Sequence, residues 1–102
     1  MKRAVVYARL AHKEDDGTRL NRQAQELQKY CEEKGYKVVK TIKEYHNGRT
    51  VSSDLLSVVA DNAYLDVLVI KDKSRICRMT HECVLFEQLL YEVDLELEYI
   101  EN

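Results

Sequence analysis

The stretch Asp66-Val67-Leu68-Val69-Ile70-Lys71-Asp72 decides the fold class of this chain. Four apolar residues follow one another between charged ones. Such a run is typical of a strand that is buried on both faces, as in a parallel sheet covered by helices on each side. Residues 66–72 therefore predict a strand inside an α/β domain.

Three further strands are predicted on either side of this run. Residues 3–9 have the apolar centre Ala4–Tyr7, and residues 36–44 form a second candidate. Residues 95–100 alternate apolar with acidic side chains, which is typical of a closing edge strand. Strand patterns are thus spread over the whole chain.

Three helices are predicted between these strands. The first begins at Thr18, which we predict as its N-cap, runs to about Lys34 and is ended by Gly35. Its apolar residues recur at helical spacing and are Leu20, Ala24, Leu27 and Cys31. A short second helix, capped by Ser52 or Ser53, carries Leu55, Leu56, Val59 and Ala63. The third helix has one apolar face, formed by Met79, Cys83, Phe86, Leu90 and Val93.

The alternation of strands and helices predicts one α/β domain over residues 1–102. Strands separated by helices pair in parallel through right-handed crossovers, and the helices then cover both faces of the sheet. We expect a three-layer sandwich whose central sheet has four to five mostly parallel strands. Functional sites in such sheets form at the carboxyl ends of the strands, which here are residues 9–12, 44–49 and 71–78.

The composition limits the class of protein. Hydrophobic residues make up 45% and charged residues 33% of the chain, which argues against disorder. No apolar run approaches the roughly 18 residues of a membrane span, and the amino terminus has no apolar segment of signal-peptide length, so we expect a cytoplasmic protein that does not bind membranes. Because the net charge is −2, contact with nucleic acid must come from a local cluster of arginines.

The loop after the first strand, residues 10–17, excludes two common nucleotide-binding classes. It contains neither the G-x-G-x-x-G turn of a dinucleotide-binding fold nor the G-x-x-x-x-G-K-[ST] loop of a P-loop enzyme. Asp15 and Asp16 resemble the acidic pair of a phospho-receiver domain. They lie well past the strand end, however, and nothing after the third strand fits the aspartate that such domains phosphorylate.

The cysteine spacing does not indicate a metal site. Cys77, His81 and Cys83 form C-x₃-H-x-C, whereas structural zinc sites usually have paired C-x₂₋₄-C spacing and four ligands. Cys77 and Cys83 fit better as small buried hydrophobic residues. Together with Cys31 the cysteines number three, and an odd number argues against a disulfide framework.

Arginines gather at the predicted strand ends. Arg9 ends the first strand, and Arg75 and Arg78 are three apart at the start of a helical pattern, so they share one side. Lys71 lies beside them in sequence, and Arg49 is on a neighbouring strand-end loop. Converging guanidinium groups make a good site for a phosphodiester. The alternative is that each arginine pairs with one of the 18 acidic residues on the surface.

The motifs at these strand ends resemble those of the serine recombinases, the resolvase, invertase and large serine integrase group. Tyr7-Ala8-Arg9-Leu10 is similar to the family's Y-x-R-[VL]-S opening, and Leu20–Gln23 to its L-x-x-Q helix start. Glu44–Gly48 resembles its acidic-residue-to-glycine loop, and Val69–Arg78 its V-x-x-[DS]-R-[LI]-x-R block. The resemblance spans nearly the whole chain in the family's order, and it implies the resolvase-like catalytic domain fold.

The resemblance implies the catalytic domain of a site-specific DNA recombinase. In this family a serine hydroxyl attacks a DNA phosphodiester and forms a phosphoserine link without a metal or cofactor, while arginines stabilise the charge on the phosphate oxygens. The family's catalytic residues match Arg9, Gln23, Arg75 and Arg78, with Tyr7 and Glu44 as less direct matches. The residues expected to bind DNA phosphates are Arg9, Arg49, Lys71, Arg75 and Arg78.

Departures from the family pattern indicate that this chain is catalytically inactive. The position of the nucleophilic serine, two residues after Arg9, is Ala11, which has no oxygen with which to attack phosphorus. A family arginine expected just ahead of the second helix aligns at or near Ser53. The chain also ends at Asn102, so we expect it to lack the family's long helix, which pairs subunits, and its DNA-binding domain.

Other functions remain open beside that of an inactive recombinase domain. The chain also fits a non-enzymatic regulatory or interaction module that binds a full-length recombinase, or a mobile-element remnant. It fits an active recombinase seen with its serine changed, and a small α/β interaction domain without a recombinase partner. Since about four clustered cations neutralise only a few phosphates, DNA binding by this domain alone is expected to be weak and salt-sensitive. The sequence leaves the oligomeric state open.

Overall fold

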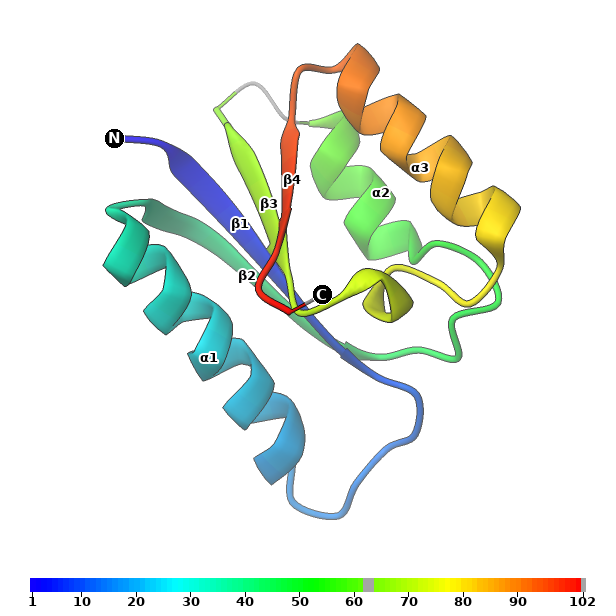
Figure 1. Ribbon diagram of the computed structural model, residues 1–102. Coiled ribbons are helices and arrows are strands. Elements are labelled where there is room, and N and C mark those ends of the chain that lie inside the picture. The colour runs from blue at the N-terminus through cyan, green and yellow to red at the C-terminus, as the bar shows by residue number, and fades with distance from the viewer. Residues whose placement is uncertain (62–63, 102) are drawn as a thin grey trace.

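The computed structural model describes residues 1–61 and 64–101, in which strands alternate with helices (Figure 1). The strands are β1 (Arg3–Leu10), β2 (Lys37–Tyr45), β3 (Val67–Ile70) and β4 (Glu96–Tyr99). The α-helices are α1 (Thr18–Lys34), α2 (Ser53–Ala60) and α3 (Thr80–Glu92), and a 3₁₀ turn, η1, spans Lys73–Arg75. Within this described part, no helix is both long enough and apolar enough to cross a membrane. The order of strands and α-helices is the one that the sequence predicts.

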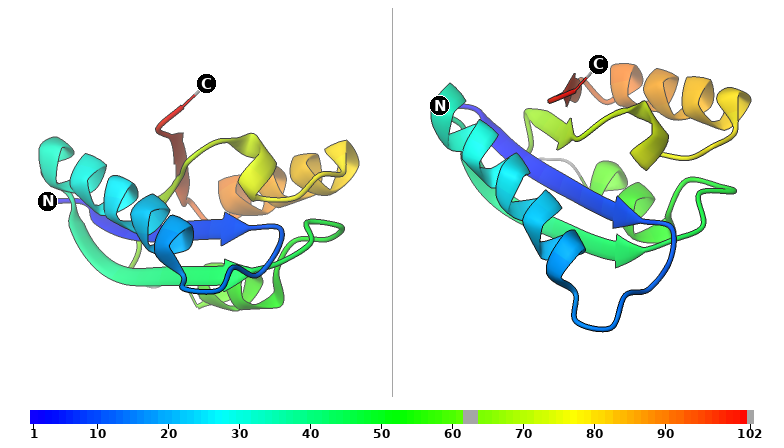
Figure 2. Two further views of the ribbon diagram at one scale, coloured as in Figure 1. Left: turned by 90° about the horizontal axis from the view of Figure 1, so that it is seen from below. Right: turned by 60° about the horizontal axis from the view of Figure 1, so that its bottom comes forward.

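The sheet has the strand order β2-β1-β3-β4, and every neighbouring pair is parallel. Helix α1 covers one face of the sheet, while α2 and α3 cover the other (Figures 1 and 2). The predicted three-layer α/β sandwich is thus confirmed, with four strands and with β4 at an edge. Because all strands run the same way, the ends of β1, β2 and β3 lie along one edge of the sheet, and the loops that follow them meet there.

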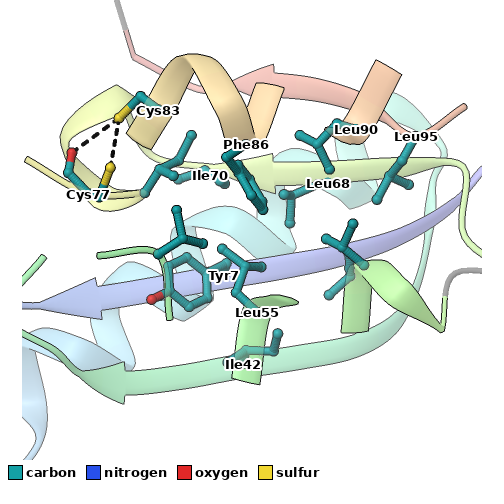
Figure 3. Packing of buried hydrophobic residues seen from close by; sticks show 14 residues of the cluster. Tyr7, Ile42, Leu55, Leu68, Ile70, Cys77, Cys83, Phe86, Leu90 and Leu95 are labelled. Atoms are coloured by element: carbon teal, nitrogen blue, oxygen red, sulfur yellow. Dashed lines mark hydrogen bonds between the residues drawn. The ribbon is translucent and has the colours of Figure 1, made fainter. Parts of the chain in front are cut away.

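Two apolar clusters hold the layers together, one on each face of the sheet. Side chains alternate along β1, so Tyr7 lies in the cluster under α2 and α3, while Val6 and Ala8 lie in the cluster under α1. All four residues of β3 are fully buried, which confirms the prediction of a strand covered on both faces. Figure 3 shows the cluster under α2 and α3, where Leu55 and Phe86 point from the helices toward the sheet.

The start of α1 corrects one prediction. Thr18 is the first helical residue and not the N-cap, because Gly17 occupies the cap position with φ +73°. Acidic loop side chains bind the free N–H groups of the first turn instead. The Asp16 carboxylate accepts from Thr18 N at 3.0 Å, and the Glu14 carboxylate accepts from the next two N–H groups at 2.9 Å. Burial raises the pKa of Glu14, but these hydrogen bonds outweigh it and hold the pKa below its usual value.

The other predicted helix caps are confirmed. Gly35 ends α1 in the left-handed conformation with φ +78°, which a glycine adopts without steric cost. Ser52 caps α2, since its hydroxyl accepts from Leu55 N at 3.4 Å. Leu55 is buried as predicted, whereas Leu56 is 38% exposed. Ala63, also predicted for this helix, lies outside the described residues.

The segment before α3 departs from the prediction. Arg75 lies in η1, Arg78 lies in the loop that follows, and α3 begins only at Thr80, so the predicted helical pattern through the two arginines is wrong. The Arg78 N–H donates to Gly48 O at 2.7 Å, a tertiary bond that takes the place of a helical one. Met79 stays outside the apolar face of α3 and is 46% exposed.

Candidate functional site at the strand ends

The loops after β1, β2 and β3 meet at one edge of the sheet (Figure 2). Arg9 in β1 lies opposite Glu44 in β2, and one residue further along each strand Leu10 lies opposite Tyr45. The parallel ladder continues into the loop, where His46 N donates to Leu10 O at 3.0 Å. This register brings the motif residues of the three loops into one neighbourhood.

Arg9 is buried, with only 3% of its surface exposed, and its guanidinium binds main-chain carbonyls. Nε donates to Arg75 O at 3.0 Å, Nη2 donates to Ser74 O at 2.6 Å, and Nη1 donates to His46 O. Burial lowers the pKa of Arg9, and the positive charges of Arg75 and Arg78 act in the same direction. In this structure Arg9 therefore connects β1 to the loops that follow β2 and β3.

Gln23 fixes α1 to the end of β1. Its side chain is 4% exposed and exchanges two hydrogen bonds with the main chain of Arg9. The amide oxygen accepts from Arg9 N at 2.9 Å, and the amide nitrogen donates to Arg9 O at 3.2 Å. Gln23 thus satisfies one donor and one acceptor of the buried Arg9 main chain, as buried polar groups require.

Tyr7 and Glu44, the two less direct family matches, form a pair. The Tyr7 side chain is fully buried in the cluster under α2 and α3, and its hydroxyl donates to the Glu44 carboxylate at 2.5 Å. Burial raises the pKa of Tyr7, and the neighbouring Glu44 carboxylate raises it further. The phenol therefore stays protonated and joins β1 to β2.

Gly48 allows Arg9 and Arg78 to approach the main chain. Its φ is +79°, and a Cβ at this position would lie 3.0 Å from Arg9 Nη1 and 3.2 Å from Arg78 Cγ. Arg78 is exposed, whereas Arg9 is buried. The two side chains thus share one patch of loop, with Arg78 on the solvent side.

Arg75 and Lys71 line a pocket of about 200 Å³ between α1 and the loop after β3. Arg75 Nη1 donates to Arg9 O at 3.3 Å, and its Nε lies 3.8 Å from the Asp72 carboxylate. Arg19 and Arg22 of α1 complete the cationic lining of this pocket. The family motifs assign no role to these two arginines. Their signal in the sequence is a spacing of three at the start of the first helix, which places both on one side.

The site has no nucleophile at the expected place. Ala11 follows directly after β1 and is exposed. Over the described residues, the pocket at the end of β1 is lined by no serine, threonine, tyrosine or cysteine. The Ser74 hydroxyl binds the Asp72 carboxylate in the turn that begins η1. Ser53, at or near which a family arginine is expected, is the exposed first residue of α2.

The remaining predicted cation, Arg49, is exposed on the loop beside Gly48. Its backbone N–H donates to the Asn47 side chain at 2.9 Å. No hydrogen bond or ion pair fixes the Arg49 side chain among residues 1–61 and 64–101. The structure therefore places Arg49 on the correct loop without bringing it into a defined contact with Arg75 or Arg78.

Cys77 and Cys83 are buried, as the hydrophobic interpretation expects. Their Sγ atoms lie 3.0 Å apart between η1 and α3 (Figure 3), and burial raises the pKa of Cys77 to about 11. The His81 side chain is exposed. Among the described residues, no group of three or more His, Cys, Asp or Glu side chains could hold a metal ion.

Known proteins resemble this chain in sequence and fold. The family model "Resolvase, N terminal domain" matches residues 4–102. The C-terminal catalytic domain of ISC1926 TnpA, an IS607-like serine recombinase, is 29% identical with a TM-score of 0.83, and the match covers 98% of this chain and 69% of that one. The N-terminal catalytic domain of TP901-1 integrase is 16% identical with a TM-score of 0.78 over 97% of this chain and 77% of its own.

A resolvase family site-specific recombinase from Streptococcus pneumoniae shares the fold as well. It is 12% identical with a TM-score of 0.78, over 98% of this chain and 72% of its own. The family model spans almost the entire sequence, and the fold agrees with it from β1 to β4. This chain therefore belongs to the resolvase family of serine recombinases and has the fold of their catalytic domain.

Proposed function

We propose that this domain contacts DNA phosphates in the manner of its family but does not cleave DNA through a serine. Ala11 is the observation that carries the proposal, because it follows β1 where the family motif has its nucleophile. A methyl group has no lone pair with which to attack phosphorus, so no phosphoester with the protein can form at this position. The 29% identity to ISC1926 TnpA, a serine recombinase, supports DNA as the ligand.

The cations at the strand ends support phosphate contact without strand cleavage. Arg78 is exposed beside Gly48, and Arg75 and Lys71 line the pocket between α1 and the loop after β3. A guanidinium can donate two parallel hydrogen bonds to phosphate oxygens. We assign phosphate binding to Arg49, Lys71, Arg75 and Arg78. The proposal involves no metal and no cofactor.

Arg9 and Gln23 act as positioning residues in this proposal. The guanidinium of Arg9 donates to three main-chain carbonyls, so these donors hold the loops that carry Arg75 and Arg78. Gln23 fixes the main chain of Arg9 through two further bonds. Arg9 and Gln23 therefore contribute to phosphate binding indirectly, by holding the other arginines in position.

The first prediction concerns covalent chemistry. Incubation of the purified chain with sheared genomic DNA of its source cell should give no protein–DNA adduct after denaturation in detergent, because position 11 has no hydroxyl. The adduct is measured by denaturing electrophoresis, in which radiolabelled DNA that is covalently bound to protein migrates with the protein. Ala11→Ser is the matched variant, and an adduct in this variant alone assigns the lost chemistry to the missing oxygen. An adduct formed by the unmodified chain would contradict the proposal.

A second function, binding of a full-length serine recombinase, is favoured by an apolar groove between α2 and α3. The groove has a volume of about 150 Å³ and is lined largely by apolar side chains. Leu56 on α2 and Leu85 on α3 line it and are 38% and 59% exposed. Contiguous exposed apolar side chains mark interaction surfaces. A domain without a nucleophile can still join a recombinase assembly through such a surface.

The second prediction tests this partner. A pull-down from the source cell with this chain as bait should recover a full-length serine recombinase, identified by mass spectrometry. Leu85→Glu should reduce the recovery strongly, since it places a charge in the groove. Tyr91→Glu is the matched control on the same helix, as Tyr91 is 83% exposed and outside the groove. Equal recovery with both variants, or recovery of no recombinase, would contradict this function.

A further inference from the structure

The pocket between α1 and the loop after β3, called here the α1 pocket, is lined by two arginines to which the family motifs assign no role. Four cations surround it, Arg19 and Arg22 from α1 and Lys71 and Arg75 from the strand-end loop. Its volume of about 200 Å³ has room for several water molecules, each of which occupies about 30 Å³ in the liquid. The pocket is therefore large enough for a small hydrated anion.

Among the described residues, two of the four cations of the α1 pocket have no ion partner. Within the described part of the chain, the side chains of Arg19 and Arg22 have no ion pair and no hydrogen bond. Lys71 lies 3.7 Å from the Glu101 carboxylate. Glu26 is the one carboxylate in the lining and forms no ion pair with these cations over the same residues. Asp72 likewise lies 3.8 Å from Arg75 Nε. Four cations against the carboxylates of Glu26, Asp72 and Glu101 leave one positive charge in excess, and Arg19 and Arg22, which have no ion partner among the described residues, favour a bound anion.

Arg75 provides an independent observation. Its Nε is buried from solvent and donates no hydrogen bond, and the Asp72 carboxylate at 3.8 Å is too far away to accept one. A buried charged donor without an acceptor is unfavourable, and such groups in proteins normally have a partner. Because Arg75 lines the α1 pocket, its guanidinium brings unused donor capacity to this site.

The α1 pocket is distinct from two neighbouring features. The N–H groups at the start of α1 are already bound by Glu14 and Asp16, so the helix terminus itself is not the anion site. The guanidinium of Arg9 donates to carbonyls and does not line the pocket. Any anion bound here must be held by the side chains of Arg19, Arg22, Lys71 and Arg75.

We propose that the α1 pocket binds a backbone phosphate of DNA, and that Arg19 and Arg22 hold it together with Arg75. This inference rests on the proposed function and adds a second phosphate contact to that of Arg78, which lies beside Gly48 and does not line the pocket. Guanidinium groups suit a phosphodiester because their planar donors match two phosphate oxygens at once. Arg22 stands directly before Gln23, so the residue that fixes Arg9 also fixes this turn of α1.

The test uses the salt dependence of DNA binding by the whole chain. Fluorescence anisotropy of a labelled duplex at increasing KCl gives the affinity and its slope against salt. The double variant Arg19→Gln/Arg22→Gln should weaken binding several-fold and reduce the slope by about 0.9 for one lost phosphate contact. The control Lys29→Gln/Lys40→Gln removes the same charge from exposed sites outside the pocket, and it should change both quantities much less. Circular dichroism verifies the fold of each variant.

A second measurement identifies the anion and keeps the two proposals separable. In NMR titrations, the Nε–Hε signals of Arg19, Arg22 and Arg75 should shift together with the duplex, while that of Arg3 should not. If the chain binds DNA but both double variants behave alike, the α1 pocket is overturned and the proposed function stands. If inorganic phosphate shifts these signals and the duplex does not, the pocket is a small-anion site and the proposal is overturned. If the chain binds no DNA at any salt concentration, both proposals fall.

Discussion

Replacing Arg9 by alanine is expected to lower the free energy of unfolding by about 3–5 kcal/mol, because three partly buried carbonyls lose their donor and each unsatisfied group costs about 1–3 kcal/mol. The whole stability of a domain of this size is about 5–15 kcal/mol. The variant should therefore melt more than about 12 °C below the unmodified chain, at about 4–8 °C per kcal/mol. Thermal unfolding followed by circular dichroism measures the shift.

Two matched variants show what the Arg9 guanidinium contributes. Arg9→Lys keeps the charge, but an ammonium group lacks the planar fork of donors that reaches His46 O, Ser74 O and Arg75 O together. The variant should therefore lose most of the same stability. Arg78→Ala removes an equal charge from an exposed side chain and should change stability by less than about 0.5 kcal/mol. Arg78→Ala should instead weaken DNA binding.

This contrast separates the two roles that the family resemblance assigns to one set of arginines. If Arg9→Ala unfolds like the unmodified chain and loses only DNA affinity, Arg9 is a phosphate ligand and the positioning role is wrong. If Arg9→Ala loses stability while Arg78→Ala loses affinity, the loops at the strand ends need Arg9 for their shape and Arg78 for their ligand.

Much of the fold could be predicted because its signals are local. The unbroken run Val67–Ile70 predicts a strand covered on both faces, and the structure buries it completely. The apolar spacing of α1 and the glycine at position 35 predict that helix and its end. Periodicity and capping depend on neighbouring residues in the chain, so they are readable without tertiary contacts.

The path of the chain before α3 could not be predicted, because a tertiary contact decides it. Arg75 and Arg78 have helical spacing, yet the Arg78 N–H binds Gly48 O from a loop that is 30 residues away in sequence (78 minus 48). Thr18 is a good N-cap by residue type, but Glu14 and Asp16 reach the first N–H groups from the preceding loop. In both places a specific hydrogen bond overrides a local preference.

The candidate site could be predicted as a neighbourhood but not as a set of contacts. The motif spacing predicted that Arg9, Arg75 and Arg78 lie at one edge of the sheet, and the structure places them there. It gave no indication that Arg9 donates to carbonyls, because main-chain acceptors leave no trace in the sequence. It also missed Arg19 and Arg22, since Arg19 lies before the L-x-x-Q motif of this helix and Arg22 occupies one of its unspecified positions.

Gly48→Ala is expected to cost about 2–5 kcal/mol in stability and to weaken DNA binding with it. The φ of +79° is a conformation that costs an alanine about 1–2 kcal/mol. The new Cβ would also lie 3.0 Å from Arg9 Nη1 and 3.2 Å from Arg78 Cγ. Crowding of this kind adds about 1–3 kcal/mol when the neighbour cannot move. Arg9 is held by its hydrogen bonds to carbonyls, so its contact with the new methyl group is costly to relieve, while the exposed Arg78 can be displaced.

Gly35→Ala provides the matched control for this substitution. Its φ of +78° is nearly the same, but no atom lies within 4 Å of the added Cβ. The variant should therefore lose only the backbone cost of about 1–2 kcal/mol and keep the DNA affinity of the unmodified chain. Urea unfolding of the two variants measures the difference, which isolates the collision with the arginines. If Gly48→Ala and Gly35→Ala lose the same free energy of unfolding, the Arg9 side chain moves freely away from the new methyl group. Arg9 would then not be held firmly by its hydrogen bonds, and the large loss of stability expected of Arg9→Ala would be wrong as well.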